Sequence, residues 1–329
     1  MTAAGQANEE ITASAVIADI GATNARFAHV LRDGRIVDQR VYLCEDYPTL
    51  EEALDHYRSE LGVKLRQAAL AVASPVTGDR VTFTNNPWSF SIAEVRSRLG
   101  LDHLAVVNDF LANALSIPRL DPGDWRQIGG GTPAPGMPVG IIGAGSGLGV
   151  SGVVPAACGD RTAWVPLAGE GGHATLAPTT ARESEVLDRM RRRYDHVSAE
   201  RALSGPGLVN LYTVLAEIDG VPAKPFTPPQ ITDPATGAEE PLCREAVEMF
   251  CAMLGTVAGN LALTLGARGG IYIAGGIVPK LGAMFDGSQF RRRFEAKGRF
   301  QSYLAEIPTR LITHPIPAFV GLAGLLRPA

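Results

Sequence analysis

Residues 16–30 read VIADIGATNARFAHV, and residues 139–154 read VGIIGAGSGLGVSGVV. Each stretch is a short apolar run, a glycine-containing turn and a second apolar run, which is typical of two strands joined by a tight turn. Each turn also carries a hydroxyl side chain, Thr23 in the first and Ser146 in the second. The repetition predicts two similar β-turn-β units, and we expect them to face each other across one cleft.

Strand and helix patterns alternate around these two units. Apolar strand patterns cover residues 67–73 and 104–107, a helical pattern covers 110–116, and a last buried strand is expected at 270–274. Such alternation indicates an α/β fold with a partly parallel sheet. The 329 residues exceed what one hydrophobic core usually serves, so we expect two domains, with the Gly- and Pro-rich segment 121–138 at their junction.

Composition and charge exclude several classes of protein. The net charge is −4, from 30 basic and 34 acidic residues, which argues against nucleic acid as the main partner. Four cysteines form no C-x-x-C pair, so free thiols in the reducing cytoplasm are expected. Residues 1–14 are polar and lack the apolar stretch of a signal peptide, and they predict a disordered tail.

Two further segments need an interpretation. Residues 249–267 carry no charge and are long enough to span a bilayer, but Asn260 and closely flanking charges favour a buried helix, so no membrane is expected. Residues 221–241 hold six prolines and predict a loop or lid.

The turn of the first unit suits a Mg-phosphate group. Asp19 ends a strand and can hold Mg²⁺ directly or through water. Gly21 lets backbone N–H groups approach phosphate oxygens, and Thr23 and Asn24 can donate hydrogen bonds. The alternative is a plain hairpin turn, because Asp, Gly and Asn favour turns.

The turn of the second unit predicts another phosphate cradle, with four glycines in residues 143–149. A dinucleotide fingerprint fails on spacing, because the sixth position is Leu148 counted from Gly143 and Val150 counted from Gly145. A Walker motif fails because no Gly-Lys pair occurs in the chain. A flexible turn without function is the alternative.

Acidic and polar groups follow several of the expected strands. Asp109 stands at the end of a strand, where a carboxylate can take the proton of an attacking hydroxyl, although helix capping by Asp109 is the alternative. Glu170 and His173 flank two glycines and can bind sugar hydroxyls, or be an exposed acid and a structural histidine. Glu200 opens a short helix, where the helix dipole also explains it. Gly275 leaves room for a flat adenine, or forms a strand-to-helix turn.

Taken in order, these stretches resemble those of bacterial glucokinases, within the hexokinase and actin-like ATPase fold. The resemblance covers nearly the whole chain beyond the tail. The stretches that carry it are Asp19–Arg26, Thr84–Asn85, Asn108–Phe110, Gly143–Val150, Gly169–His173, His196–Leu211, Ile273–Pro279 and Phe294–Phe300.

The resemblance implies ATP-dependent phosphorylation of glucose to glucose 6-phosphate, with Asp109 as the general base for the sugar's 6-hydroxyl. It implies residues that bind the sugar, residues that hold Mg²⁺ and phosphates, a second phosphate loop and a residue under the adenosine. The implied sugar ligands are Asn108, Glu170, His173 and Glu200, and the implied Mg²⁺ and phosphate residues are Asp19, Gly21, Ala22, Thr23 and Asn24. The implied second phosphate loop is Gly145, Ser146 and Gly147, and the residue under the adenosine is Gly275.

The resemblance also implies a two-domain actin-like ATPase (ribonuclease-H-like) α/β fold, with a cleft that closes on the sugar. Residues 15–119 and 309–329 are expected to form the small domain and residues 120–308 the large one. Family members are commonly dimers, so a cytoplasmic homodimer is expected. Ala22 stands where a second glycine is usual, which strains the loop only if its φ is positive.

Two alternatives remain open. In the first alternative the chain is a kinase for another hexose, such as mannose or fructose. In the second it is a non-catalytic actin-like or regulatory protein that binds ATP. The presence of Asn108, Glu170, His173 and Glu200 together argues against the second alternative, because an ATP-driven filament protein has no need of a sugar site.

Overall fold

The computed structural model describes residues 15–83, 86, 88–159 and 161–326, so the tail expected over residues 1–14 lies outside the described part. The chain divides into two compact units. The first runs to Leu120 and includes the segment from Pro315, and the second runs from Asp121 to His314. We describe each unit by itself.

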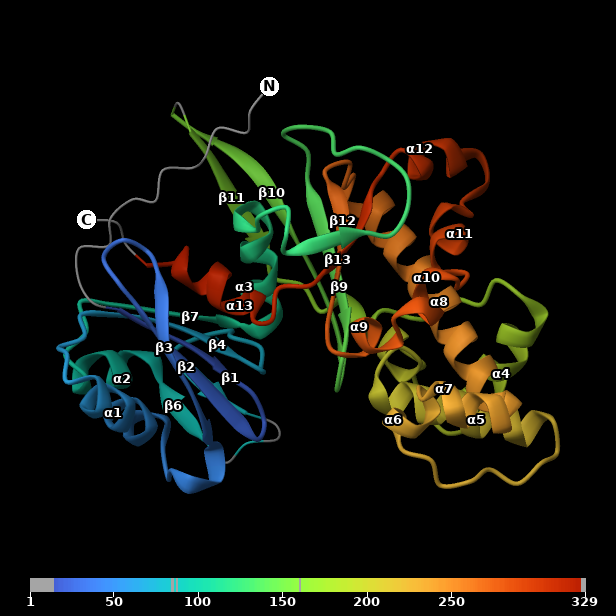
Figure 1. Ribbon diagram of the computed structural model, residues 1–329, viewed down its shortest axis with the longest axis horizontal. Helices are drawn as coiled ribbons and strands as arrows, with labels where there is room; N and C mark the ends of the chain where they lie inside the picture. Colours follow the sequence, from blue (N-terminus) through green and yellow to red (C-terminus); the bar gives the residue numbers. More distant parts are fainter. Residues whose placement is uncertain (1–14, 84–85, 87, 160, 327–329) are drawn as a thin grey trace. The chain divides into compact units, whose positions relative to one another are not determined.

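The first unit is built on a five-stranded sheet in the order β3-β2-β1-β4-β7 (Figure 1). β1 pairs antiparallel with β2, and β2 with β3, whereas β1, β4 and β7 are parallel. Its elements are β1 (Ala15–Ile20), β2 (Asn24–Val30), β3 (Ile36–Leu43), α1 (Leu50–Leu61), β4 (Gln67–Val72), β5 (Arg80–Thr82), β6 (Ser89–Ser91), α2 (Ile92–Arg98), β7 (His103–Asn108), α3 (Asp109–Ser116) and α13 (Pro317–Ala323), with 3₁₀ helices at Cys44–Asp46 and Ile117–Arg119.

Alternation of side chains along the strands gives this sheet two apolar faces. Val16, Ala18 and Ile20 of β1 pack in the cluster that α1 and α2 cover. Ala15 and Ile17 pack in the opposite cluster, with α3 and α13. Both faces of the sheet are therefore buried. The candidate site residues of this unit lie at or beyond the ends of its strands.

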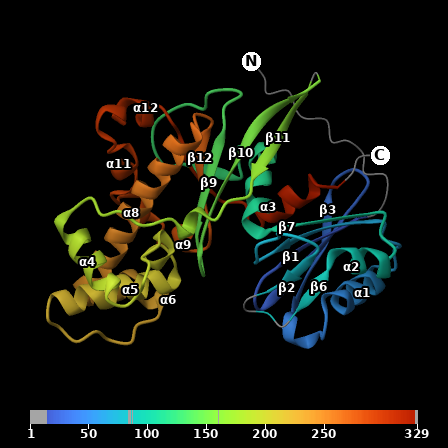
Figure 2. The ribbon, with the colours of Figure 1, turned by 180° about the vertical axis from the view of Figure 1, so that it is seen from behind.

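The second unit is built on a six-stranded sheet in the order β11-β10-β9-β12-β13-β8. Figure 2 labels β11, β10, β9 and β12 of this sheet. Its strands are β8 (Trp125–Gln127), β9 (Val139–Ala144), β10 (Leu148–Cys158), β11 (Arg161–Leu167), β12 (Gly270–Ala274) and β13 (Thr309–Ile312). Its helices are α4 (Ala181–Arg191), α5 (Gly205–Ile218), α6 (Pro228–Ile231), α7 (Pro234–Glu239), α8 (Pro241–Leu265), α9 (Ile277–Leu281), α10 (Ala283–Asp286), α11 (Phe290–Glu295) and α12 (Gln301–Ala305), with 3₁₀ helices η3 (Gly171–His173), η4 (Ala199–Arg201) and Gly298–Phe300.

Strand β13 corrects the expected domain boundary. The sequence analysis placed residues 309–329 with the small domain. In the structure β13 pairs in parallel with β12 and antiparallel with β8, so it belongs to the second sheet. The division accordingly falls after His314.

Helix α8 is the apolar segment that is long enough to cross a membrane. It is the one helix in the described part of the chain that passes this test, and 72% of its most apolar window is buried inside the protein. A Cβ at Gly255 would lie 2.1 Å from the carbonyl oxygen of Phe290, and one at Gly259 would lie 2.6 Å from that of Phe294. These glycines let α11 pack directly on α8, which confirms the prediction of a buried helix.

Other parts of the second unit differ from the expectation. The segment 221–241, expected as a loop or lid, contains α6 and α7, and each of them begins with proline. Strands β8 and β11 were not expected.

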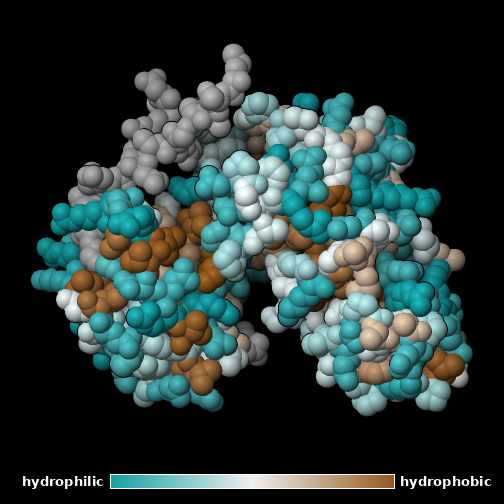
Figure 3. Space-filling model, viewed as in Figure 1, coloured by the Kyte–Doolittle hydropathy of each residue, from teal (hydrophilic) through white to brown (hydrophobic). Residues whose placement is uncertain are grey.

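On the face shown in Figure 3, hydrophilic residues dominate and hydrophobic residues form separate patches.

Candidate functional site

The glycine turn, Gly145–Gly147, joins β9 to β10 in the second unit. Ala144 pairs with Leu148, and the N–H of Gly145 donates to the carbonyl of Gly147 at 2.8 Å. The turn is therefore as tight as the glycine spacing predicted. Its backbone, with two glycines in three residues, leaves peptide groups open to close approach by a ligand.

Two other segments meet this turn. The N–H of Gly205, the first residue of the 14-residue helix α5, donates to the carbonyl of Gly145 at 2.8 Å. Gly275 has a φ of +81°, and a Cβ there would lie 2.3 Å from the carbonyl oxygen of Ala144. The turn therefore lies beside the positive end of a helix, which favours phosphate binding. Position 275 requires glycine, because its φ is positive and a side chain there would collide with the backbone of Ala144.

The 169–173 loop packs flat against β10. A Cβ at Gly172 would lie 1.9 Å from the carbonyl oxygen of Leu148, and one at Gly171 would lie 2.8 Å from the Val150 side chain. The two glycines thus fix η3 beside the glycine turn. Glu170 and His173, at either side of them, are both exposed.

Glu200 also reaches the glycine turn, from η4. Its Oε2 accepts a hydrogen bond from the N–H of Leu148 at 2.9 Å. The start of η4 is held by the chain that follows the 169–173 loop, since the N–H of Ala199 donates to the carbonyl of Ala174 at 2.9 Å. The second unit therefore gathers Gly145, Ser146, Gly147, Glu170, His173, Glu200 and Gly275 around one hairpin.

The first unit presents the other predicted residues at one edge of its sheet. Ile20 aligns with Val72, and Val72 with Asn108, in the parallel ladders of β1, β4 and β7. The carboxyl ends of these strands therefore meet at the same edge, where an α/β sheet presents its functional groups. Asp19 and Asp109 lie there together.

The turn after β1 is closed by its own backbone. The N–H of Gly21 donates to the carbonyl of Asn24 at 2.9 Å, and the carbonyl of Gly21 accepts from the side-chain amide of Asn86 at 3.1 Å. Ala22 and Thr23 are exposed. Among the described non-glycine residues only Asp38 has a positive φ, so Ala22 does not strain the turn.

Asp19 is a largely buried carboxylate beside a basic side chain. Burial raises the pKa of its carboxyl, and Arg26, at 3.6 Å, partly opposes that shift. The described residues contain no group of three His, Cys, Asp or Glu side chains that could hold a metal alone. A single carboxylate suits Mg²⁺ that arrives with phosphate oxygens and water as its other ligands.

Asn108 rather than Asp109 caps helix α3, so capping by Asp109 is wrong as an alternative. The Asn108 Oδ1 accepts from the N–H groups of Phe110 and Leu111, at 2.9 and 3.3 Å. Asp109 is the first helical residue, and its Oδ1 accepts from the N–H of Phe110 at 2.8 Å. The cap holds Asp109 at the start of α3, directly beyond the sheet edge.

Sequence reasoning missed two residues that shape the site, Asn86 and Gly205. The stretch Ser204-Gly205-Pro206 carried a usable signal, because a serine before proline is a common helix start. Asn86 gave no such signal, because it holds Gly21 from 65 residues away.

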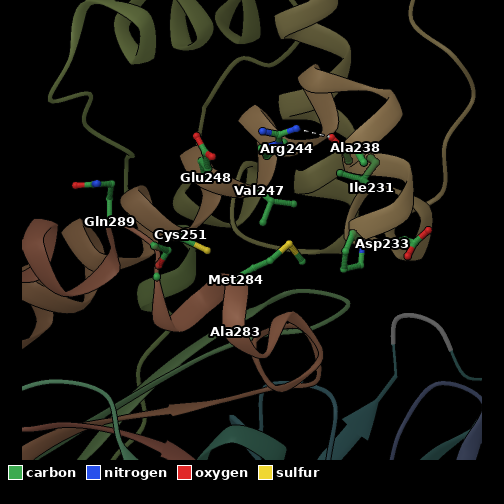
Figure 4. A pocket seen from close by; sticks show the side chains of 14 residues that line it. Ile231, Asp233, Ala238, Arg244, Val247, Glu248, Cys251, Ala283, Met284 and Gln289 are labelled. Atoms are coloured by element: carbon green, nitrogen blue, oxygen red, sulfur yellow. Dashed lines mark hydrogen bonds between the residues drawn. The ribbon is translucent and has the colours of Figure 1, made fainter.

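A cavity of about 530 Å³ in the second unit contains none of the predicted site residues. The sulfur atoms of Cys251 and Met284 point into it (Figure 4). Burial raises the pKa of the Cys251 thiol to about 12, so the thiol stays protonated. The residues that line the cavity are Ile231, Asp233, Pro234, Gly237, Ala238, Arg244, Val247, Glu248, Cys251, Ala283, Met284, Gly287, Ser288 and Gln289.

Comparison with known proteins gives the family. The model of the family described as Glucokinase matches residues 16–329. The chain belongs to the glucokinase family. The glucokinase of Paramagnetospirillum magneticum is 54% identical to it over 94% of this chain and 97% of that one. The glucokinase of Aromatoleum aromaticum is 52% identical over 94% of each.

Solved structures of glucokinases share the fold. A glucokinase from an Antarctic psychrotroph superposes with a TM-score of 0.86 at 34% identity, covering 95% of this chain and 98% of that one. A ROK family glucokinase from Streptomyces griseus, in complex with glucose and AMPPNP, has a TM-score of 0.62 at 19% identity, covering 95% and 99%. The second likeness concerns the fold alone. The two α/β units are those of the actin-like ATPase fold of glucokinases.

Proposed function

We propose that this chain transfers the γ-phosphoryl group of Mg-ATP to the 6-hydroxyl of D-glucose and releases glucose 6-phosphate and ADP. The observation that carries the proposal is the identity of 54% with a glucokinase over nearly the full length of both chains. The order of the two phosphate turns and the sugar residues along the chain supports the same reaction.

In this proposal Asp109 accepts the proton of the 6-hydroxyl while that oxygen bonds to the γ-phosphorus and the bond to the bridging oxygen of ADP breaks. Sugar hydroxyls are bound by Asn108, Glu170, His173 and Glu200. Asp109 and the glycine turn belong to different units, so the proposal includes closure of a cleft on the sugar, which excludes water as a competing acceptor.

The phosphates are assigned to the two turns. Backbone N–H groups of the glycine turn and the first turn of α5 are suited to them, and Ser146 adds a hydroxyl. On the first unit Gly21, Ala22, Thr23 and Asn24 would meet the phosphates, and Asp19 would hold Mg²⁺, which neutralises phosphate charge when bound. Gly275 would lie under the adenosine.

The test is a coupled assay of sugar 6-phosphate formation with Mg-ATP over glucose, mannose, fructose and galactose. We expect kcat/KM to be highest for glucose. Preference for another hexose would assign the chain to that sugar, and no turnover with any hexose while Mg-ATP still binds would favour the regulatory alternative.

We further propose that the enzyme is a homodimer of the cytoplasm. All four cysteines are free, two of them completely buried, which suits a reducing compartment. Sedimentation velocity at micromolar concentration should give the mass of two chains, and a single-chain mass would contradict the dimer.

A further inference from the structure

Glu200 touches the glycine turn directly. Its Oε2, which accepts from the Leu148 N–H, lies 2.5 Å from the place that a Cβ on Gly147 would take. Among the described residues other than the two chain neighbours of Gly147, only the Glu200 carboxylate comes within 4 Å of that place, and the φ of Gly147 is one that alanine also adopts. The missing side chain at position 147 therefore leaves room for this carboxylate.

The segment that carries Glu200 holds the glycine turn at both ends. At one end the side chain of Glu200 binds the Leu148 N–H, and at the other the N–H of Gly205 donates to the Gly145 carbonyl at 2.8 Å. The hydroxyl of Ser204 connects these two contacts, because it donates to the Glu200 carbonyl at 2.8 Å and also accepts from the Gly207 N–H as the cap of α5. Residues 200–205 thus form one clamp on the turn.

We propose that Glu200 is a positioning residue for the glycine turn, so that it serves the nucleotide site as well as the sugar. The proposal rests on the proposed function, which assigns phosphates to this turn. A charged acceptor binds an N–H more strongly than a neutral one. It orders a glycine-rich turn in advance, and it thereby lowers the entropy that nucleotide binding must otherwise remove.

The experiment measures the affinity of the full chain for Mg-AMPPNP by calorimetry in the absence of sugar. Glu200→Ala should bind this nucleotide about tenfold more weakly, the size expected for a lost hydrogen bond to a charged group. Glu200→Gln should stay within about threefold, because its amide oxygen can still accept from Leu148. His173→Ala is the matched control, and it should bind the nucleotide as the wild type does, since its expected role is with the sugar.

A double-mutant cycle tests the same contact from the other side. Gly147→Ala places a methyl group against the Glu200 carboxylate and should weaken nucleotide binding. In the Glu200→Ala background the same methyl group has room, so Gly147→Ala should then cost much less. If Glu200→Ala folds poorly, Gly147→Ala is measured alone, because this variant keeps Glu200, and nucleotide binding as tight as that of the wild type would contradict the proposal. Strictly additive effects would contradict the proposal.

The outcomes separate the two proposals. If Glu200→Ala binds Mg-AMPPNP as the wild type does while its KM for glucose rises, Glu200 is a sugar ligand alone and the positioning role falls. Tighter nucleotide binding by both Glu200 variants would mean that the carboxylate acts by repelling phosphate, which also overturns the role. If the wild type binds Mg-AMPPNP but phosphorylates no hexose, the proposed function fails while the nucleotide affinities still decide the role of Glu200.

Discussion

At the scale of single residues, Asn108 and Asp109 at the end of β7 have similar side chains but different structural roles. Asn108 caps α3 through its Oδ1, which leaves the next residue, Asp109, in the first helical turn. Both residue types are good caps, so the sequence could not tell which of them would do it. The structure resolves this because the cap must have extended backbone, and Asn108 has a φ of −62° and a ψ of 148°.

Glu170 gives a prediction at this scale. It is exposed beside two glycines that fix the loop backbone, so Glu170→Gln should leave the fold intact. A sugar hydroxyl that donates to a carboxylate loses a charge-assisted hydrogen bond, so the KM for glucose should rise about tenfold or more. The KM for Mg-ATP, measured in the same steady-state assay, should change little. An unchanged KM for glucose would remove Glu170 from the sugar site.

At the scale of elements, the sequence predicted best those segments whose pattern is local. The two β-turn-β units, β1–β2 and β9–β10, and the long helix α8 follow from runs of apolar residues and turns. Strand β11 did not, because Pro166 lies inside it, and proline is tolerated there only because β11 is an edge strand.

Prolines also misled the prediction for residues 221–241. Pro228 and Pro234 each occupy a first helical position, where the missing N–H costs nothing. Short helices started in this way are stabilised by packing on α8 rather than by their own sequence. A sequence reading that treats proline as a break therefore cannot find them.

The packing of η3 on β10 predicts the effect of two glycine substitutions in one loop. Gly172→Ala would push a methyl group into the backbone carbonyl of Leu148, whereas a Cβ at Gly169 would meet nothing within 4 Å. Gly172→Ala should therefore raise the KM for glucose and lower the thermal midpoint by several degrees. Gly169→Ala is the matched control and should behave as the wild type. Equal behaviour of the two variants would show that η3 is not fixed by this contact.

A buried ion pair joins α4 to α11 and gives a prediction about pH. The Glu183 carboxylate, 3% exposed, accepts from Arg293 at 2.5 Å and from the Thr179 N–H at 2.7 Å. Burial alone raises the pKa of Glu183, but the hydrogen bonds from Arg293 and Thr179 outweigh it, and the pKa lies below its usual 4.5. The stability from this pair is therefore present above pH 4.5 or so and is lost as the pH falls toward the folded pKa.

Urea unfolding between pH 3 and pH 7 checks this. Glu183→Gln should lower the free energy of unfolding at pH 7 by about 3 kcal/mol, because Arg293 stays buried beside a neutral group. The loss should shrink toward low pH, where the wild type also loses the charge. Glu185→Gln, an exposed acid on the same helix, is the control. A difference between wild type and Glu183→Gln that does not change with pH would contradict the ion-pair account.

At the scale of the whole molecule, the predicted residues divide between the two units. Asp19 and Asp109 lie at one sheet edge of the first unit, and the glycine turn with Glu170, His173 and Glu200 lies on the second. The motifs could be found from sequence because each is a short run of residues. The clamp of residues 200–205 on the glycine turn could not, because it joins segments more than 50 residues apart.

The measurement that tests the central claim most directly compares wild type with Asp109→Asn in the coupled assay with glucose and Mg-ATP, together with glucose affinity from calorimetry. If Asp109 is the general base, the variant should bind glucose within about threefold of the wild type and lose turnover by roughly 10²–10⁴-fold. Near-normal turnover by Asp109→Asn would contradict the assignment of the base, and with it the mechanism proposed for this chain.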